Sequence, residues 1–170
     1  MIKILGIAAT AAMLLAGPAL AAEKLTIETS KGCAFDIKLR ADLAPKHVAQ
    51  VTKLAAAGFY NGIVFHRVID GFMAQTGDPT GTGTGGSSEP NIPVEFSKAH
   101  YARGTVGAAR TADPNSANSQ FFIMFDEGGF LDGQYTVWGE VDEAGMACVD
   151  KIERGEPPAN PDKMVKVTVH

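Results

Sequence analysis

Residues 65–78, FHRVIDGFMAQTGD, alternate their side chains at a period of two on both sides of a turn at Asp70-Gly71. This is the period of a β-strand, whose successive side chains point to opposite faces of a sheet. Two neighbouring strands would then present one surface made of Phe65, Arg67, Phe72 and Gln75. Arginine carries five donors and no acceptor, and it keeps its proton in proteins. A site built around Arg67 is therefore expected to donate hydrogen bonds and not to shuttle protons.

Alternation continues along most of the chain and predicts short strands. Residues 25–27 and 35–39 alternate around a turn at Ser30-Lys31-Gly32, which predicts a hairpin with one buried face. Helical spacing after Pro45 and again over residues 143–152 predicts two short helices. Further strands are expected at residues 105–109, 121–125, 136–141 and 165–169. Many short strands with few helices favour one mainly β domain, either a closed antiparallel barrel or a sandwich.

The first 21 residues have the features of a secretory signal peptide. Lys3 supplies a short positive region, an apolar stretch follows, and residues 17–21, GPALA, end in a small-x-small pattern. We therefore expect a signal peptide at 1–21 and a folded domain at 22–170 that is soluble and periplasmic after cleavage, with no membrane contact. The alternative is an uncleaved anchor, because the apolar stretch approaches the length of a membrane span. Gly17 and Pro18 interrupt the helix that such an anchor needs.

Charge and metal-ligating residues exclude several classes of protein. The net charge is −4 and the isoelectric point is near 5.5, so the chain has no electrostatic attraction to nucleic acid. The four histidines are scattered and the two cysteines form no CxxC motif, so neither a metal site nor a cofactor is expected. Two free thiols at Cys33 and Cys148 are favoured, but export would permit a disulfide and only geometry can decide.

Residues 81–86, GTGTGG, satisfy the dinucleotide-binding pattern GxGxxG literally. That fingerprint requires the third glycine to open a helix, whereas here residues 87–90, SSEP, follow. The segment from Gly77 to Pro93 is therefore predicted to be a surface loop with tight turns.

Three motifs, residues 65–78, NSQFFI at 118–123 and FLDGQYTVWGEV at 130–141, resemble those of the cyclophilin family of peptidyl-prolyl cis-trans isomerases. They occur in the family's order, and the resemblance covers essentially the whole chain after the leader. It implies a closed eight-stranded antiparallel barrel with a helix closing each end, at residues 45–57 and 143–152. It also implies an isomerase, without a cofactor, that acts on proline-containing polypeptides and assists the folding of exported proteins.

The resemblance also assigns a site to residues of this chain. The catalytic arginine falls on Arg67, with His66 beside it among the substrate-binding positions. The proline pocket falls on Phe72, Met73, Phe122 and Leu131, the substrate-backbone contacts on Gln75 and on the main chain near Ala109 and Arg110, and the rim on Gln120, Phe130 and Tyr135. A structural role is favoured for His66, because the chemistry requires no base. Any one apolar pocket residue taken alone fits a core position better, and only the three ordered motifs together favour the site.

Two positions depart from the best-known eukaryotic pattern. That pattern has tryptophan where this chain has Phe130, and histidine where it has Tyr135. The indole N–H contributes to cyclosporin binding in that group and phenylalanine has no such donor, so weak cyclosporin binding with retained catalysis is expected. A non-catalytic proline-binding or chaperone module could use the same groove. Arg67 favours the enzyme, because a pocket that only binds has no need of it. The domain is expected to be a monomer.

Overall fold

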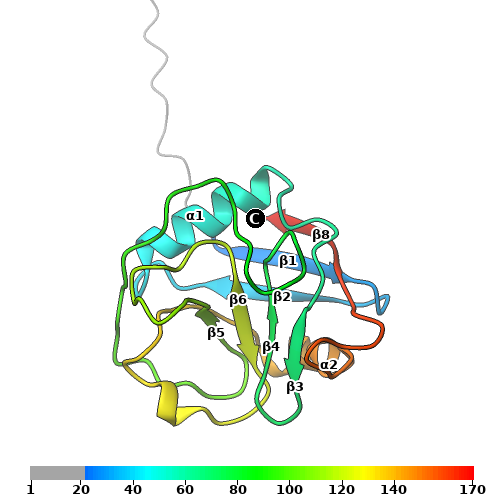
Figure 1. Ribbon diagram of the computed structural model, residues 1–170. Helices are drawn as coiled ribbons and strands as arrows, with labels where there is room; N and C mark the ends of the chain where they lie inside the picture. The colour runs from blue at the N-terminus through cyan, green and yellow to red at the C-terminus, as the bar shows by residue number, and fades with distance from the viewer. Residues whose placement is uncertain (1–21) are drawn as a thin grey trace, which may run out of the picture.

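The computed structural model describes residues 22–170, so the predicted signal peptide at 1–21 lies outside the described residues. The domain is mainly β, with eight strands, two α-helices and one 3₁₀ turn, η1 (Figure 1). In chain order the elements are β1 (Lys24–Thr29), β2 (Ala34–Leu39), α1 (Pro45–Ala56), β3 (Arg67–Ile69), β4 (Met73–Thr76), β5 (Thr105–Ala108), β6 (Phe121–Met124), η1 (Gly129–Leu131), β7 (Val137–Glu140), α2 (Glu143–Val149) and β8 (Met164–Val169). The expected hairpin, strand pair and helices are present, and α2 ends three residues before the predicted Ile152.

All eight strands belong to one antiparallel sheet with the order β3-β4-β6-β5-β7-β2-β1-β8. The two ends of the described chain meet within it, because β1 pairs with β8 and the Glu23 amide donates to the His170 carbonyl at 2.7 Å. The sheet curves round so that the segment before β8 returns to β3.

The expectation of a closed barrel is wrong, because β3 and β8 do not pair and the barrel is an open half-barrel. β3 has only three residues, and the chain before β8 lies alongside it. The seam between the edges is crossed by isolated bridges that join Val64 to Lys163 and Val68 to Gly155. Alternating side chains predict strands, but they do not say whether the first and last strands of a sheet meet.

The two helices pack on different parts of the sheet. α1 contacts β7 and β8, and α2 contacts β2. Pro45 occupies the first turn of α1, where the missing amide proton costs nothing, and the Glu95 carboxylate accepts the amides of Lys46 and His47. Asp142 caps α2 by accepting the Gly145 amide at 2.7 Å. Within residues 22–170, no helix has both the length and the apolar character needed to cross a membrane.

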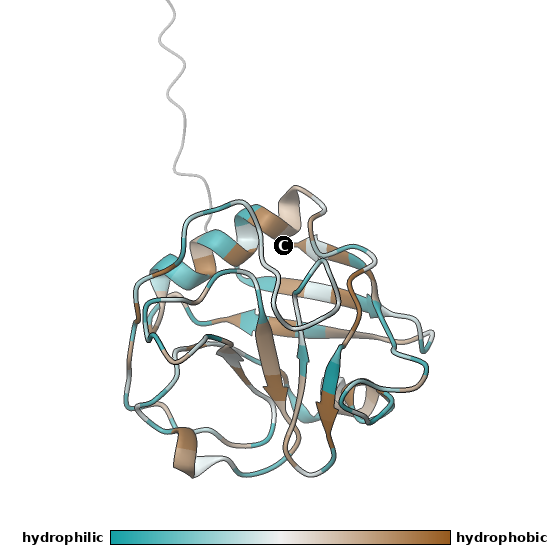
Figure 2. Cartoon of the chain, viewed as in Figure 1, coloured by the Kyte–Doolittle hydropathy of each residue, from teal (hydrophilic) through white to brown (hydrophobic). Residues whose placement is uncertain are grey.

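The sheet separates a large core from a smaller apolar cluster. In β6 every residue is buried, and Figure 2 shows this strand as hydrophobic along its length. Because strand side chains alternate, Phe121 and Ile123 enter the large core with Trp138, while Phe122 and Met124 enter the smaller cluster. The second cluster includes Met73, Phe122 and Leu131, which the sequence assigned to substrate binding.

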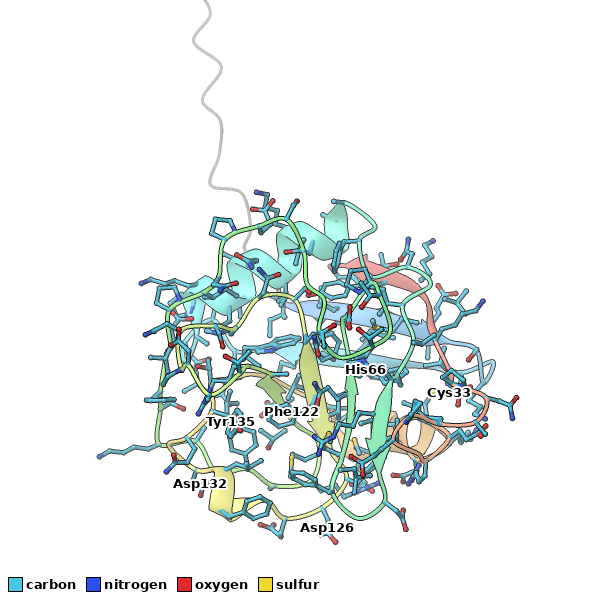
Figure 3. All side chains as sticks on the ribbon, in the orientation of Figure 1. Cys33, His66, Phe122, Asp126, Asp132 and Tyr135 are labelled. Atoms are coloured by element: carbon cyan, nitrogen blue, oxygen red, sulfur yellow. A yellow bond between two sulfur atoms is a disulfide. The ribbon has the colours of Figure 1, made fainter. Side chains whose placement is uncertain are left out.

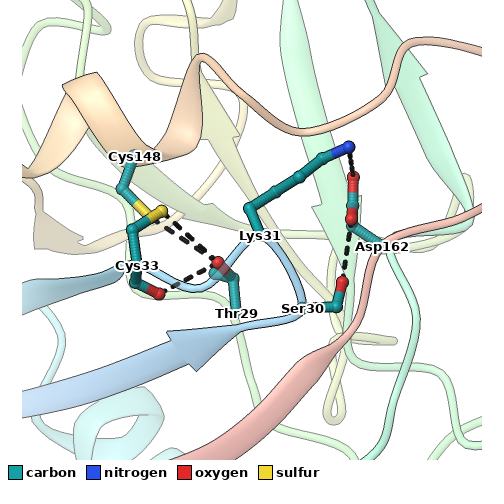
Figure 4. The surroundings of a disulfide bond; sticks show 6 residues. All are labelled: Thr29, Ser30, Lys31, Cys33, Cys148 and Asp162. Carbon is teal, nitrogen blue, oxygen red and sulfur yellow. Dashed lines mark hydrogen bonds and ion pairs between the residues drawn. A yellow bond between two sulfur atoms is a disulfide. The ribbon is translucent and has the colours of Figure 1, made fainter.

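Cys33 and Cys148 form a disulfide, with their Cα atoms 5.9 Å apart (Figure 4). The favoured reading of two free thiols is therefore wrong. Cys33 immediately precedes β2, and α2 packs on that strand, so the tertiary contact between elements 115 residues apart brings the sulfurs together. Thr29 lies beside both, with its Oγ1 3.5 Å from one sulfur and 3.6 Å from the other.

Candidate active site

A pocket of about 340 Å³ opens above the smaller apolar cluster. It is lined by Arg67, Phe72, Met73, Gln75, Ala109, Arg110, Phe122, Phe130, Leu131 and Tyr135. All ten were assigned to the site from the sequence, and β3, β4, β6, η1 and the segments after β5 and before β7 bring them together. Their roles in binding and catalysis stay predictions, whereas their meeting in one pocket is a structural fact.

The floor of the pocket is buried and its rim is exposed. Met73 and Phe122 are 2% and 5% exposed, whereas Phe130 is 71% exposed. The Phe122 ring, from β6, packs edge-on against Tyr135, with 5.8 Å between ring centroids; both side chains are labelled in Figure 3. The rings of Phe72 and Phe130 lie next to each other at the rim, with 5.6 Å between their centroids. A small apolar ring such as proline would lose its water on entering this floor, while the chain on either side of it stays in solvent.

Arg67 is the first residue of β3 and stands at the edge of the pocket. Its Nε donates to Glu156 Oε1 at 2.8 Å, and its side chain is 44% exposed. This is the only hydrogen bond that the guanidinium makes with the described residues, so both Nη groups are available to a ligand. Arg67 lies directly opposite Gln75 in the β3–β4 ladder. A cationic donor and a side-chain amide thus share one wall of the pocket.

Gln75 is held by a chain of hydrogen bonds that begins in the glycine-rich loop. Its Nε2 donates to Gln120 Oε1 at 3.0 Å. Gln120 in turn donates to the carbonyls of Gly83 and Gly85, at 3.0 and 2.8 Å. Gln120 does not line the pocket itself but borders a neighbouring hollow of about 490 Å³ that shares Gln75, Ala109 and Arg110 with it. The predicted surface loop therefore supports the site.

Arg110 separates the pocket from that hollow. Its guanidinium carbon lies 4.3 Å from the centroid of the Tyr135 ring, a cation–π contact. Its Nη groups donate to the carbonyls of Thr111 and Gln134, at 2.9 and 2.7 Å. With these partners Arg110 forms a rigid part of the pocket wall.

Two residues of the first motif face elsewhere. Phe65 was expected to share a surface with Arg67, but it is fully buried in the large core, because the strand begins only at Arg67. His66 does not line the pocket: it is 6% exposed, and neither ring nitrogen has a hydrogen-bond partner in the described part of the chain (Figure 3). Burial lowers the pKa of His66, even though the charge of Asp78 opposes the shift. This environment fits the structural role favoured for it.

Sequence reasoning missed the residues that support the pocket from behind. The buried Tyr101 ring stacks on Phe122 at 5.8 Å, and a Cβ at Gly107 would lie 2.5 Å from both side chains, so β5 needs glycine there. A glycine inside a strand can indicate such a close approach, and this was the available signal.

A second support clasps the turn that carries Phe130 and Leu131. His100 bridges two carboxylates that flank η1, because its Nδ1 lies 2.7 Å from Asp132 and its Nε2 lies 2.7 Å from Glu127. Asp132 also accepts the Tyr101 amide. Nothing in the local sequence pattern predicts this clasp, because its members are 27 and 32 residues apart.

The pocket offers hydrogen-bond donors beside an apolar floor. None of the ten lining residues is histidine, cysteine, aspartate or glutamate. In residues 22–170, no group of three or more such residues could hold a metal ion. The arrangement can hold an apolar ring, bind neighbouring peptide groups and place a fixed positive charge near them.

Comparison with known proteins agrees with this geometry. A family model described as cyclophilin type peptidyl-prolyl cis-trans isomerase matches residues 24–169. A probable peptidyl-prolyl cis-trans isomerase of Brucella suis is 56% identical, over 78% of this chain and 76% of its own. A crystal structure of a cyclophilin from Hirschia baltica superposes with a TM-score of 0.77 at 32% identity, covering 87% of this chain and 74% of its own. A cyclophilin type isomerase of Cryptosporidium parvum, crystallised in the presence of the dipeptide Ala-Pro, gives a TM-score of 0.78 at 28% identity, covering 86% and 98%.

Proposed function

The chain belongs to the cyclophilin-type peptidyl-prolyl cis-trans isomerase family, which makes it a prolyl isomerase, and we propose that Arg67 and its pocket form the catalytic site. Proline would sit on Met73, Phe122 and Leu131, with the peptide chain running along Gln75. The observation that carries the proposal is a guanidinium with both Nη groups unengaged by the described residues, at the edge of a pocket with a dry apolar floor.

The chemistry of the X-Pro bond explains why a donor serves here. The bond rotates slowly because the nitrogen lone pair is shared with the carbonyl, which gives a barrier of about 18–20 kcal/mol. In the twisted transition state this conjugation is lost and the nitrogen becomes basic. A fixed donor near that nitrogen binds the twisted amide better than either planar form, which is the requirement for catalysis. No proton is transferred and no covalent intermediate forms.

The size of the rate enhancement shows that Arg67 and the pocket must both contribute to transition-state stabilisation. Uncatalysed rotation takes roughly 10–100 s, so turnover near ~10³ s⁻¹ requires roughly 7 kcal/mol of transition-state stabilisation. One charge-assisted hydrogen bond contributes about 1.5–3 kcal/mol. The remainder must come from desolvation and from holding the proline ring while the preceding residue turns.

Exchange NMR on a short Ala-Pro peptide tests the proposal. Arg67→Ala should slow catalysed cis-trans exchange about 10–100-fold, the equivalent of one charged hydrogen bond, while peptide binding persists. Arg40→Ala is the matched control, because Arg40 pairs with Asp42 and does not line the pocket. Binding without acceleration by the unchanged protein would mean a proline-recognition module. Acceleration that survives Arg67→Ala would refute the donor role and keep the enzyme.

We also propose that the isomerase assists the folding of exported proteins in the periplasm. The leader pattern at 1–21 supports this, and so does the disulfide between Cys33 and Cys148, because disulfides persist mainly in oxidising compartments. Cell fractionation with intact-mass measurement tests it. A soluble periplasmic product beginning at Ala22 is expected, whereas a full-length product in the membrane fraction would favour the uncleaved anchor.

A further inference from the structure

Glu156 makes the single hydrogen bond that the described residues provide to the Arg67 guanidinium, from Nε to Oε1 at 2.8 Å. Glu156 therefore binds the guanidinium at Nε, the nitrogen nearest the aliphatic part of the side chain, and leaves both Nη groups free to bind a ligand. We propose that Glu156 is a positioning residue, which holds Arg67 toward the pocket before substrate arrives. This inference rests on the donor role proposed for Arg67.

The backbone around Glu156 is fixed against β3. Gly155 and Val68 exchange both of their main-chain hydrogen bonds, at 2.7 and 2.8 Å, in an isolated antiparallel bridge. The register of this bridge puts Glu156 directly opposite Arg67. Residues opposite each other in an antiparallel pair carry their side chains on the same face and within reach of one another. The contact between Arg67 and Glu156 thus follows from the strand pairing.

Further contacts anchor the same segment on both sides. The Glu153 amide donates to Asp162 at 2.9 Å, and Asp162 is 6% exposed. Arg154 places its guanidinium carbon 4.0 Å from the centroid of the Phe125 ring and donates to Asp70 at 3.1 Å. Glu156 therefore projects from an ordered backbone and can orient a longer, more flexible partner.

Exposure indicates where the effect of this pair should be measured. The Arg67 and Glu156 side chains are 44% and 53% exposed, and such ion pairs contribute little to the stability of a fold. An unpaired, half-exposed arginine would occupy many rotamers and would have to be ordered each time the amide twists. Holding it beforehand removes that cost from the chemical step. The pair should therefore affect the rate on the enzyme more than stability or peptide affinity.

The experiment separates on-enzyme rate from affinity. NMR lineshapes of an Ala-Pro peptide, titrated to saturation, give both the dissociation constant and the exchange rate in the complex. Glu156→Ala should lower that rate by about 3–10-fold, as expected for a reacting group that is no longer held in place, with the dissociation constant changed less than ~2-fold. Glu156→Gln keeps an acceptor at Oε1 and should restore the rate to within ~2-fold of the original. Failure of the Gln variant to restore the rate would overturn positioning by this hydrogen bond.

Two further variants complete the test. Asp70→Ala removes the pair with Arg154 on the same segment without touching Arg67, and it should leave the rate within ~2-fold. A loss as large as that of Glu156→Ala would mean that movement of the segment is responsible, and would overturn the inference. In an Arg67→Ala background, Glu156→Ala should have no additional effect, and an undiminished effect there would show that Glu156 acts by another route. If the Arg67→Ala variant keeps full activity, the donor role proposed for Arg67 is wrong. If Arg67→Ala slows the reaction but Glu156→Ala does not, only the positioning role of Glu156 is refuted.

Discussion

Asp78 organises the glycine-rich loop beside the candidate active site, and Asp78→Asn is expected to destabilise the domain. The carboxylate is 1% exposed. Its Oδ1 accepts the amide and the hydroxyl of Thr80, both at 2.8 Å, and its Oδ2 accepts the amides of Thr82, Gly83 and Gly85, at 3.1, 2.6 and 3.1 Å. Asparagine keeps one acceptor oxygen, so in either orientation of its amide an NH₂ group meets donors that the carboxylate had satisfied.

Two lines of argument give the size of the effect. Burial alone would raise the pKa of Asp78, but hydrogen bonds from Thr80, Gly85 and Gly83 outweigh it and hold the pKa at about 2, against a usual value of 3.8. A shift of that size corresponds to roughly 2–3 kcal/mol of stability. Hydrogen bonds to a charged group contribute about 1.5–3 kcal/mol each. If the loop opens in the variant, its amides can form most of these bonds with water instead, so the losses do not add up in full. We therefore expect Asp78→Asn to cost about 2–3 kcal/mol at pH 7.

Urea unfolding followed by fluorescence measures this cost, because Trp138 is the single tryptophan and is 1% exposed. The pKa of Asp78 is lowered in the folded state, so its contribution is complete above pH 3.8 and is lost as the pH falls toward 2. The difference between the two proteins should shrink over that range. Asp113→Asn is the matched control, because Asp113 caps an exposed turn. A difference below ~0.5 kcal/mol at pH 7, the usual size for a surface substitution, would refute the reasoning, as would a difference that does not change with pH.

Three further predictions concern the clasp, the disulfide and the rim. His100 donates hydrogen bonds to Asp132 and Glu127, which raise its pKa, so its contribution to stability is present below about pH 6.5 and lost as the pH rises through the raised value; Asp132→Asn should bring the NMR-measured pKa back toward 6.5. Reducing the disulfide between Cys33 and Cys148 should cost about 2–5 kcal/mol in urea unfolding, and an unchanged midpoint would contradict this. Phe130→Trp should tighten cyclosporin binding measured by titration, because the indole supplies the missing donor, and equal affinities would count against that explanation.

The sequence predicted the strands and helices because each depends on local periodicity. The alternation about Asp70-Gly71 became the β3–β4 hairpin, and the spacing after Pro45 became α1. Periodicity does not fix tertiary pairing, and the wrong predictions of free thiols and of a closed barrel both arise there. The disulfide depends on α2 packing against β2, and closure of the barrel depends on whether a three-residue strand can pair with β8. Neither contact leaves a pattern in the segments that it joins.

The candidate site likewise combines residues that local patterns predict with residues that only the fold brings together. Eight of the ten residues that line the pocket lie within three local motifs, so the resemblance found them, although neither the alternation nor the resemblance showed that Phe65 and His66 turn away from it. The supports of the pocket come from distant segments. Glu156 is 89 residues from Arg67, and the fold alone brings them together. Sequence patterns thus identify groups that contact a ligand more readily than groups that hold them.

The open seam of the half-barrel explains where such a supporting group can come from. In a fully closed barrel, the outer edge of β3 would form hydrogen bonds with β8, and Arg67 would lie opposite a residue of that strand. Here the outer edge of β3 pairs instead with Gly155, in a segment that is not a strand of the sheet. That segment can place a carboxylate opposite Arg67 because its neighbours, Arg154 and Glu153, are anchored elsewhere. Incomplete closure therefore leaves room at the edge of the sheet for the residue that we propose to orient Arg67.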